Sequence, residues 1–141
     1  MPRELTEKQL EFGRKLGLNL EQSSFRVALA RINDFILKDF VGEAPRKPSF
    51  SQIKLCKKFG VDVSDESSRV AEAMVQDILE NLNIESVRTQ DLKFGDIVKN
   101  RQDSIQRHYV ISSIDDFGIV TFQGSDKEKA PARNLIKIGK K

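Results

Sequence analysis

The amino-acid sequence predicts an α+β protein in which a duplicated four-helix N-terminal domain is followed by a small C-terminal antiparallel β-barrel. The first observation is a repeat, because the run FGRKLGLNLEQSSFRVA at 12–28 returns as LCKKFGVDVSDESSRVA at 55–71. The second is that apolar residues in both runs recur at the spacing of one helical face. The third is a change after about residue 87, where apolar and polar residues alternate as they do in strands.

The repeat extends beyond these two runs and predicts how the helical domain is built. A constant shift along the chain aligns identical residues in the pairs Gln9/Gln52, Lys15/Lys58, Gly17/Gly60, Ser24/Ser67, Arg26/Arg69, Val27/Val70, Ala28/Ala71, Ala30/Ala73 and Asp34/Asp77. Apolar positions match under the same shift, so each module carries the same apolar face. One module cannot bury that face alone, whereas two modules packed together can. We therefore interpret the repeat as an internal duplication whose copies pack against each other.

Each module is predicted to contain a helix, a short extended link and a second helix. Thr6 in the first copy, and Ser49 or Ser51 in the second, are N-cap residues ahead of helical patterns. Gly17 and Gly60 stand where a left-handed C-terminal cap is required. The segments LNL and VDV follow, and their alternation fits an extended link with both apolar side chains turned inward.

The second helix of each module is predicted to begin after a serine cap and to be the longer one. These caps are Ser24 and Ser67, and the helices are expected to end near Phe40 and Leu82. The segment VGEAPRKPS between the modules contains Gly42 and two prolines, which predicts a linker. The predicted boundaries are helical repeat 1 at 1–41, the linker at 42–48, helical repeat 2 at 49–86 and the small barrel at 87–141.

Short strands are predicted in the C-terminal third. The runs GDIVKN, HYVISSI, GIVTFQG and NLIKI, at 95–100, 108–114, 118–124 and 134–138, are rich in β-branched and aromatic residues. The segment DDFG predicts a hairpin turn, with Asp115 and Asp116 shaping it. Phe122 is expected in the core, and Tyr109 and Phe117 either in the core or on the surface. Four or five such strands favour a small barrel.

The stretches LKFGDIVKN and APARNLIKI resemble Src-homology-3-like and KOW-type barrels. Such barrels commonly open with an apolar-x-apolar-Gly-Asp-x-Val stretch and end with a short Asn-Leu strand. The resemblance covers residues 92–138. It implies a fold that serves ribosomal, DNA-binding and peptide-binding proteins alike.

The composition argues against an enzyme and against a metal protein. The chain has 141 residues with one cysteine, Cys56, and one histidine, His108, so a disulfide or a Cys/His metal site within one chain is not expected. Nucleophile, phosphate-loop and metalloprotease motifs are absent from the sequence. Cys56 is predicted to be a packed thiol and His108 a surface residue at a strand start. We expect no catalytic residue, no metal and no cofactor.

The charge pattern permits contact with a polyanion. The formal net charge is +3, and residues 91–141 carry 10 basic and 7 acidic side chains. No apolar run is long enough for a membrane span, and no secretion signal is evident, so a cytoplasmic protein is expected.

Arg26 and Arg69 stand in the first turn of the second helix of each module, where the helix dipole disfavours a cation. One interpretation is phosphate binding by a guanidinium beside helix N–H groups. The other is an internal ion pair, for instance with Asp34 and Asp77 of the partner module or with nearby acidic residues. The sequence leaves both interpretations open.

The segments LEFGRKLGLNL…SSFRVALARI and IKLCKKFGVDV…ESSRVAEAMV resemble the helix-extension-helix modules of the SAP and LEM type. SAP modules are short DNA-binding units in which a basic surface meets the backbone. The resemblance implies a similar role for the basic residues at the ends of the first helices and at the starts of the second ones. The longer second helix and the excess of acidic residues in the second copy depart from that pattern.

The sequence therefore favours a non-enzymatic protein that binds nucleic acid, DNA ahead of RNA, or assists an enzyme acting on it. Contact is expected mainly with phosphates. The alternative is a protein-interaction adaptor or inhibitor from a phage or mobile element. The predicted nucleic-acid-binding residues are Arg14, Lys15, Arg26, Lys57, Lys58, Arg69, Lys99, Arg101, Arg107, Tyr109, Lys129 and Arg133.

Overall fold

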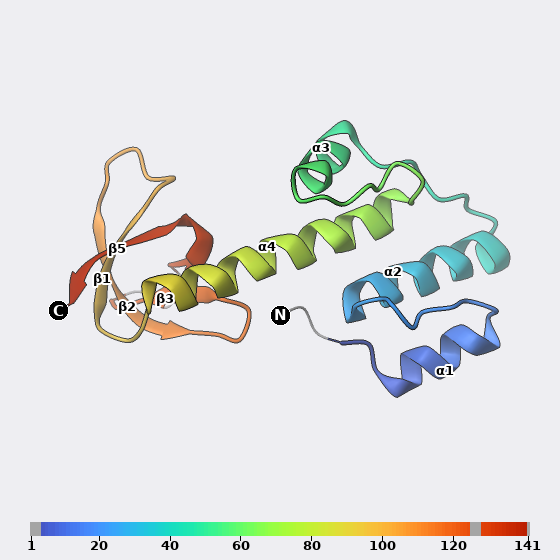
Figure 1. The fold of residues 1–141 in the computed structure, drawn as a ribbon, viewed down its shortest axis with the longest axis horizontal. Helices are drawn as coiled ribbons and strands as arrows, with labels where there is room; N and C mark the ends of the chain where they lie inside the picture. Colours follow the sequence, from blue (N-terminus) through green and yellow to red (C-terminus); the bar gives the residue numbers. More distant parts are fainter. Residues whose placement is uncertain (1–3, 125–127, 141) are drawn as a thin grey trace. The chain divides into compact units, whose positions relative to one another are not determined.

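The computed structural model describes residues 4–124 and 128–140 and divides the chain into two compact units. The first unit is Met1–Ile78 and the second is Leu79–Lys141. The first unit is helical, and the second combines the end of the last helix with a β-sheet (Figure 1). The protein is therefore α+β, as the sequence predicts.

The first unit contains two helix–link–helix modules. Their helices are α1 (Glu7–Lys15), α2 (Phe25–Ile36), α3 (Phe50–Lys58) and α4 (Ser68–Gln90), of which α4 continues into the second unit. A π-helical turn, η1 (Leu37–Val41), follows α2 and ends at Gly42, which has a φ of 79°. The predicted long helix to Phe40 therefore contains a change of helix type after Ile36.

Each module begins with a capping box. Thr6 accepts a hydrogen bond from the Gln9 amide, and the Gln9 side chain accepts one from the Thr6 amide. Ser49 and Gln52 make the same two bonds at the start of α3, which selects Ser49 over Ser51 as the cap. The predicted caps are thereby confirmed.

Glycine ends the first helix of each module. Gly17 and Gly60 have φ values of 80° and 79°, a region in which a residue with a Cβ is strained. The chain then passes into the short links, whose Leu20 and Val63 are fully buried.

The helices of the first unit pack in two kinds of contact. Within the first module, Leu20, Ala28 and Ile32 form a buried cluster flanked by Leu10 of α1 and Leu18 of the link.

Between the modules, α2 and α4 lie side by side, with α1 and α3 on opposite sides of this pair (Figure 1). A second cluster joins α2 to α4 through Val27 and Ala30 of α2 and Val70 and Ala73 of α4. The four residues are two identical pairs of the repeat, so both modules contribute equally to this seam.

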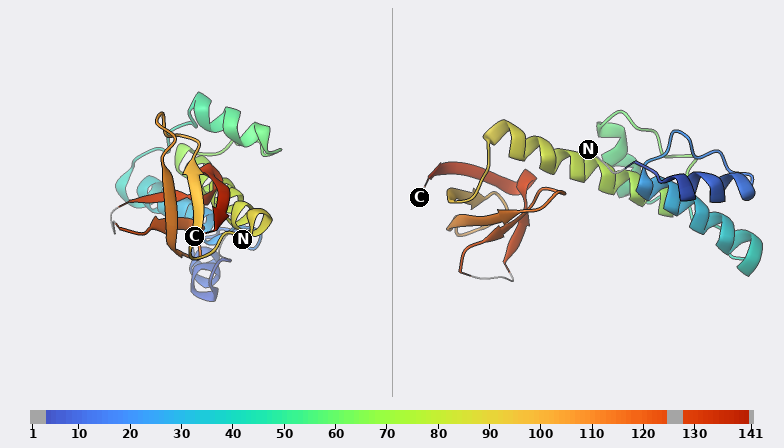
Figure 2. Two further views of the ribbon diagram at one scale, coloured as in Figure 1. Left: turned by 90° about the vertical axis from the view of Figure 1, so that its left-hand side faces the viewer. Right: turned by 90° about the horizontal axis from the view of Figure 1, so that it is seen from below.

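The sheet of the second unit has five antiparallel strands. They are β1 (Asp96–Asn100), β2 (His108–Ile114), β3 (Ile119–Phe122), β4 (Lys129–Pro131) and β5 (Leu135–Lys140), in the order β4-β3-β2-β1-β5. Register shifts at Ile97/Val98 and at Ile111/Ser113 bend the sheet. Figure 2 shows the strongly twisted strands. No ladder among the described residues joins the two edge strands, so the sheet is not closed.

The four predicted strands are present, whereas β4 was not predicted as a separate strand. It has only three residues and ends in Pro131, so it carries little pattern of its own. A 3-10 turn, η2 (Ala132–Asn134), leads from β4 to β5. The turn before β3 is closed by Asp115, whose carboxylate accepts from the amides of Phe117 and Ile119, as expected for this segment.

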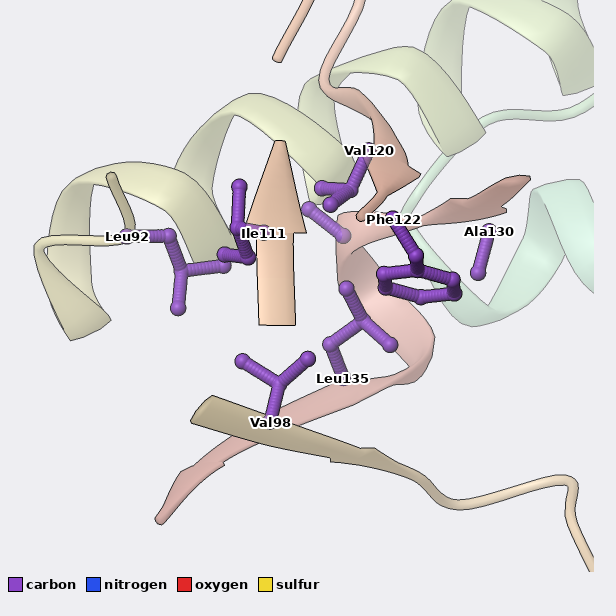
Figure 3. Close-up of a cluster of buried hydrophobic side chains, with 8 residues drawn as sticks. Leu92, Val98, Ile111, Val120, Phe122, Ala130 and Leu135 are labelled. Atoms are coloured by element: carbon purple, nitrogen blue, oxygen red, sulfur yellow. The ribbon is translucent and has the colours of Figure 1, made fainter. Parts of the chain in front are cut away.

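The core of the second unit lies on one face of the sheet. It contains Leu92, Val98, Ile111, Val120, Phe122, Ala130, Ala132 and Leu135, each at most 5% exposed (Figure 3). Phe122 is buried, as predicted, and Tyr109 packs against the cluster while remaining half-buried.

The end of α4 corrects the predicted helix boundary near Leu82, because the helix continues to Gln90. In the second unit, Asn83 accepts from the backbone and side chain of Arg133. The Gln90 amide bonds to the Leu135 carbonyl and the Lys137 amide at the free edge of β5. The apolar pattern that predicts the second helix of the module stops before this part of α4, which contacts the second unit through the polar side chains of Asn83 and Gln90 and through Val87.

Candidate nucleic-acid interface

Four of the predicted residues lie at one end of the hairpin formed by β1 and β2. The register places Lys99 opposite His108 and Val98 opposite Tyr109, while Arg101 follows β1 and Arg107 precedes β2. Because Val98 points into the core, Lys99 points to the outer face of the sheet. We call Lys99, Arg101, Arg107 and Tyr109 the hairpin site.

The loop of the hairpin site is organised by Asp103. The Tyr109 hydroxyl donates to its carboxylate at 2.7 Å, and Arg107 Nε lies 4.0 Å from the same oxygen. Two further hydrogen bonds lie within the loop. The Asp103 backbone N–H donates to the Asn100 carbonyl, and the Gln106 side-chain amide donates to the Asp103 carbonyl. The basic residues therefore stand around a loop with a defined conformation.

The Tyr109 ring lies between two partners. One face stacks on Phe122, with ring centroids 4.4 Å apart and an interplanar angle of 18°, and Arg107 lies 5.5 Å from the ring centroid. The hydrogen bond to Asp103 raises the pKa of the Tyr109 hydroxyl, since it holds the proton that ionisation would remove. In this conformation Tyr109 supports the loop.

The hairpin site carries more positive than negative charge. Arg107 and Asp103 form a long pair, with the Arg107 side chain 60% exposed, and such pairs contribute little stability. Among the described residues, neither Lys99 nor Arg101 takes part in an ion pair. These two cations thus have no structural role that would account for their charge.

The remaining two predicted residues of the sheet unit lie elsewhere. Lys129 is exposed on β4, paired in register with Thr121, and Arg133 donates to the Asn83 side chain at 3.1 Å. Arg133 therefore has a role in holding η2 on α4.

Arg26 and Arg69 form the internal ion pairs that the sequence left as one of two interpretations. Arg26 lies 3.2 Å from Asp77, and Arg69 lies 3.3 Å from Asp34. The cap residue of each module joins the same carboxylate, because Ser24 donates to Asp77 and Ser67 to Asp34. Each serine–arginine pair of one module thus binds the aspartate of the other module.

The basic residues at the ends of α1 and α3 do not form one surface. Arg14 lies 3.8 Å from Glu21, and Lys15, Lys57 and Lys58 are exposed in last turns, where cations interact favourably with the helix dipole. Because α1 and α3 lie on opposite sides of the α2–α4 pair, these two basic ends face different surroundings (Figure 1).

Several residues that organise these sites were not singled out from the sequence. Asp103 holds Tyr109 through its hydroxyl, and Glu66 makes a two-point ion pair with Arg31 at 3.1 and 3.3 Å that crosses between the modules. Arg31 aligns with Met74, so this pair has no counterpart in the repeat and no sequence signal indicates it.

The part of the chain that the structure describes contains no group of three His, Cys, Asp or Glu side chains arranged to hold a metal ion. None of its helices combines the length and the apolarity needed to cross a membrane. Comparison with models of protein families, with curated proteins and with solved structures found no match to this chain.

Proposed function

We propose that the protein is a non-enzymatic nucleic-acid-binding protein, or an accessory of a nucleic-acid enzyme, that contacts phosphates through the hairpin site. The observation that carries this proposal is the register of β1 and β2, which brings Lys99, Arg101 and Arg107 to one end of the hairpin, where Asp103 lies near Arg107 alone. Lys99 and Arg101, which form no ion pair among the described residues, and the exposed Arg107 beside a preformed loop suit a polyanionic backbone. Sequence preference is expected to be weak, and duplex DNA is the favoured ligand ahead of RNA.

We also infer that the second unit is a Src-homology-3-like barrel and that the modules arose by duplication. Support for the barrel comes from the four-strand meander, the two bulges and the return of β5 to pair with β1. Support for duplication comes from the equivalent capping boxes and from the reciprocal bonds of Ser24 and Ser67.

The proposal is tested by fluorescence anisotropy with labelled duplex DNA over a range of salt concentrations. Three phosphate contacts give a slope of log K against log salt of about −2.7. The double variant Lys99→Ala/Arg101→Ala is expected to bind less tightly and to reduce the magnitude of the slope by about 2.

A matched control is available in the first unit. Lys57→Ala/Lys58→Ala removes the same charge from exposed helix positions and is expected to leave the slope unchanged. The proposal is wrong if wild-type protein shows no binding at low salt, or if the two double variants lose affinity equally. Single-stranded RNA of the same length, measured in parallel, tests the preference for DNA.

A further inference from the structure

Two grooves lie at equivalent places in the two modules. The first groove, of about 280 Å³, is lined by Leu10, Arg14, Gly17, Leu18, Asn19, Leu20 and Glu21. The second groove, of about 440 Å³, is lined by Ile53, Lys57, Gly60, Val61 and Asp62. All five residues of the second groove align with residues of the first. Each groove therefore has an apolar floor, one basic residue on the first helix and one Asn or Asp in the link.

The grooves differ in where their carboxylate lies. In the first groove Glu21 faces Arg14 at 3.8 Å, so a carboxylate of the chain itself lies against the basic residue. In the second groove the residue aligned with Glu21 is Ser64, and Lys57 takes part in no ion pair among the described residues. The aligned residues Asn19 and Asp62 also differ, so each groove has one carboxylate, but only in the first does it lie within ion-pair distance of the basic residue. In the second groove the position that corresponds to Glu21 has no carboxylate.

The surroundings of the second groove are basic and apolar. Lys54 and Lys58 are exposed on α3 beside Lys57, and Phe50 and Phe59 are 79% and 41% exposed at the two ends of that helix. Asp62 is the acidic residue that lines the groove, and it accepts hydrogen bonds from the amide and hydroxyl of Ser64. Lys57 has no carboxylate within ion-pair distance among the described residues, and Lys54 and Lys58 lie on the same helix, so the helix side of the groove favours an anionic ligand.

The floor decides which anionic ligand fits. Ile53 and Val61 offer apolar surface, which a phosphodiester backbone does not use. A peptide segment supplies both an apolar side chain and a carboxylate.

We propose that the second groove binds a partner protein through an acidic segment, with an apolar side chain on Ile53 and Val61 and a carboxylate at Lys57. This carboxylate occupies the place that Glu21 takes in the first groove. The inference does not depend on nucleic-acid binding by the hairpin site.

The probe is the acetylated and amidated peptide EELFEE, titrated into isotopically labelled full-length protein while amide chemical shifts are recorded. Shifts are expected at Ile53, Gly60 and Val61 and not at Leu10, Gly17 and Leu18. The peptides QQLFQQ and EEGGEE, which lack the charges or the apolar side chains, are expected to cause smaller shifts.

Exchanging the distinguishing residue between the grooves is the decisive step. Ser64→Glu places a carboxylate beside Lys57, as Glu21 lies beside Arg14, and is expected to weaken peptide binding there about two- to fivefold, the range of one exposed ion pair. Glu21→Ser opens the first groove, and shifts are then expected at Leu10 and Leu18 as well. Unchanged amide spectra away from the substituted site show that both variants remain folded.

The proposal is overturned if EELFEE shifts neither groove, if it shifts both grooves equally in the wild type, or if QQLFQQ binds as well as EELFEE. It is also overturned if duplex DNA, rather than the peptide, shifts Ile53 and Val61. In that case the second groove contacts nucleic acid.

Discussion

At the scale of single residues, Asp103 contacts two of the four residues of the hairpin site. Its carboxylate accepts from Tyr109 and pairs with Arg107, so one side chain fixes both an aromatic and a cation of the loop. The sequence singled out Tyr109 and Arg107 by residue type. It gave no reason to select Asp103, since its role depends on the loop bringing position 103 back to the strand.

The chain has a single tyrosine and no tryptophan, so tyrosinate absorbance reports on Tyr109 alone. The pKa of Tyr109 is raised above the ordinary value of about 10, chiefly by the hydrogen bond to Asp103. We expect a spectrophotometric titration midpoint above that value, and Asp103→Ala is expected to return it toward 10.

The sign of the accompanying stability change follows from the raised pKa. The folded state holds the phenolic proton more tightly than the unfolded state, so this stabilisation is complete below about pH 10 and is lost as the pH rises through the raised pKa. Tyr109→Phe is expected to remove this alkaline loss from the pH profile of the unfolding free energy. A midpoint at or below the ordinary value would contradict the role assigned to Asp103.

At the scale of elements, the two modules fill the contact between the first helix and the link with side chains of different sizes. A Cβ at Gly13 would lie 2.5 Å from Leu20 Cδ1, and Leu20 is fully buried. The aligned residues Cys56 and Val63 are also fully buried, so the larger residue on the helix is accompanied by the smaller one on the link. Helix and link are therefore matched in size within each module.

This match predicts a coupling between the two positions. Gly13→Ala gains up to about 1 kcal/mol of helix propensity but overpacks the core, which typically costs 1–3 kcal/mol. Leu20→Val alone is expected to cost about 1 kcal/mol through a cavity. In urea denaturation the double variant should be more stable than the sum of the single changes predicts, by about 1 kcal/mol. Additive changes would show that Leu20 does not limit the size of residue 13.

The elements were predictable where their signals are local. Thr6, Gly17 and Gly60 each mark a helix end within one turn and were placed correctly from the sequence, which left Ser49 and Ser51 open as the fourth. The second half of α4 was not predictable in this way, because the contacts of Asn83 and Gln90 are with residues far along the chain. Helix extent there depends on tertiary contacts that no local pattern contains.

At the scale of the whole molecule, the reciprocal bonds between the modules replace a phosphate as the partner of Arg26 and Arg69. The repeat predicted which residues recur, and it contained both the arginines and the aspartates. It did not determine whether these residues meet each other or a ligand, because that choice depends on how α2 and α4 pack. The sequence likewise predicted the basic residues of the sheet unit one by one, without their arrangement. The register of β1 and β2 brings Lys99, Arg101 and Arg107 to one end of the hairpin.

Asp77 provides a test of the seam between the modules. Asp77→Ala removes the acceptor of Ser24 and the ion-pair partner of Arg26, and is expected to lower the unfolding free energy by about 1–3 kcal/mol. Asp39→Ala, at an exposed position of η1, is the control and is expected to change stability by less than about 0.5 kcal/mol. DNA affinity should be the same for both variants. If Asp77→Ala leaves stability unchanged but alters DNA affinity, Arg26 contacts phosphate and its ion pair with Asp77 is not what holds the modules together.

The buried thiol of Cys56 has a consequence for following the protein in solution. Its side chain is inaccessible to solvent, and burial raises its pKa, so the reactive thiolate is scarce in the folded chain. Because the chain holds no other sulfhydryl group, an alkylating reagent can modify it at cysteine only when the second module opens. The rate of that modification therefore measures how often this module opens, since no second cysteine of the chain is labelled at the same time.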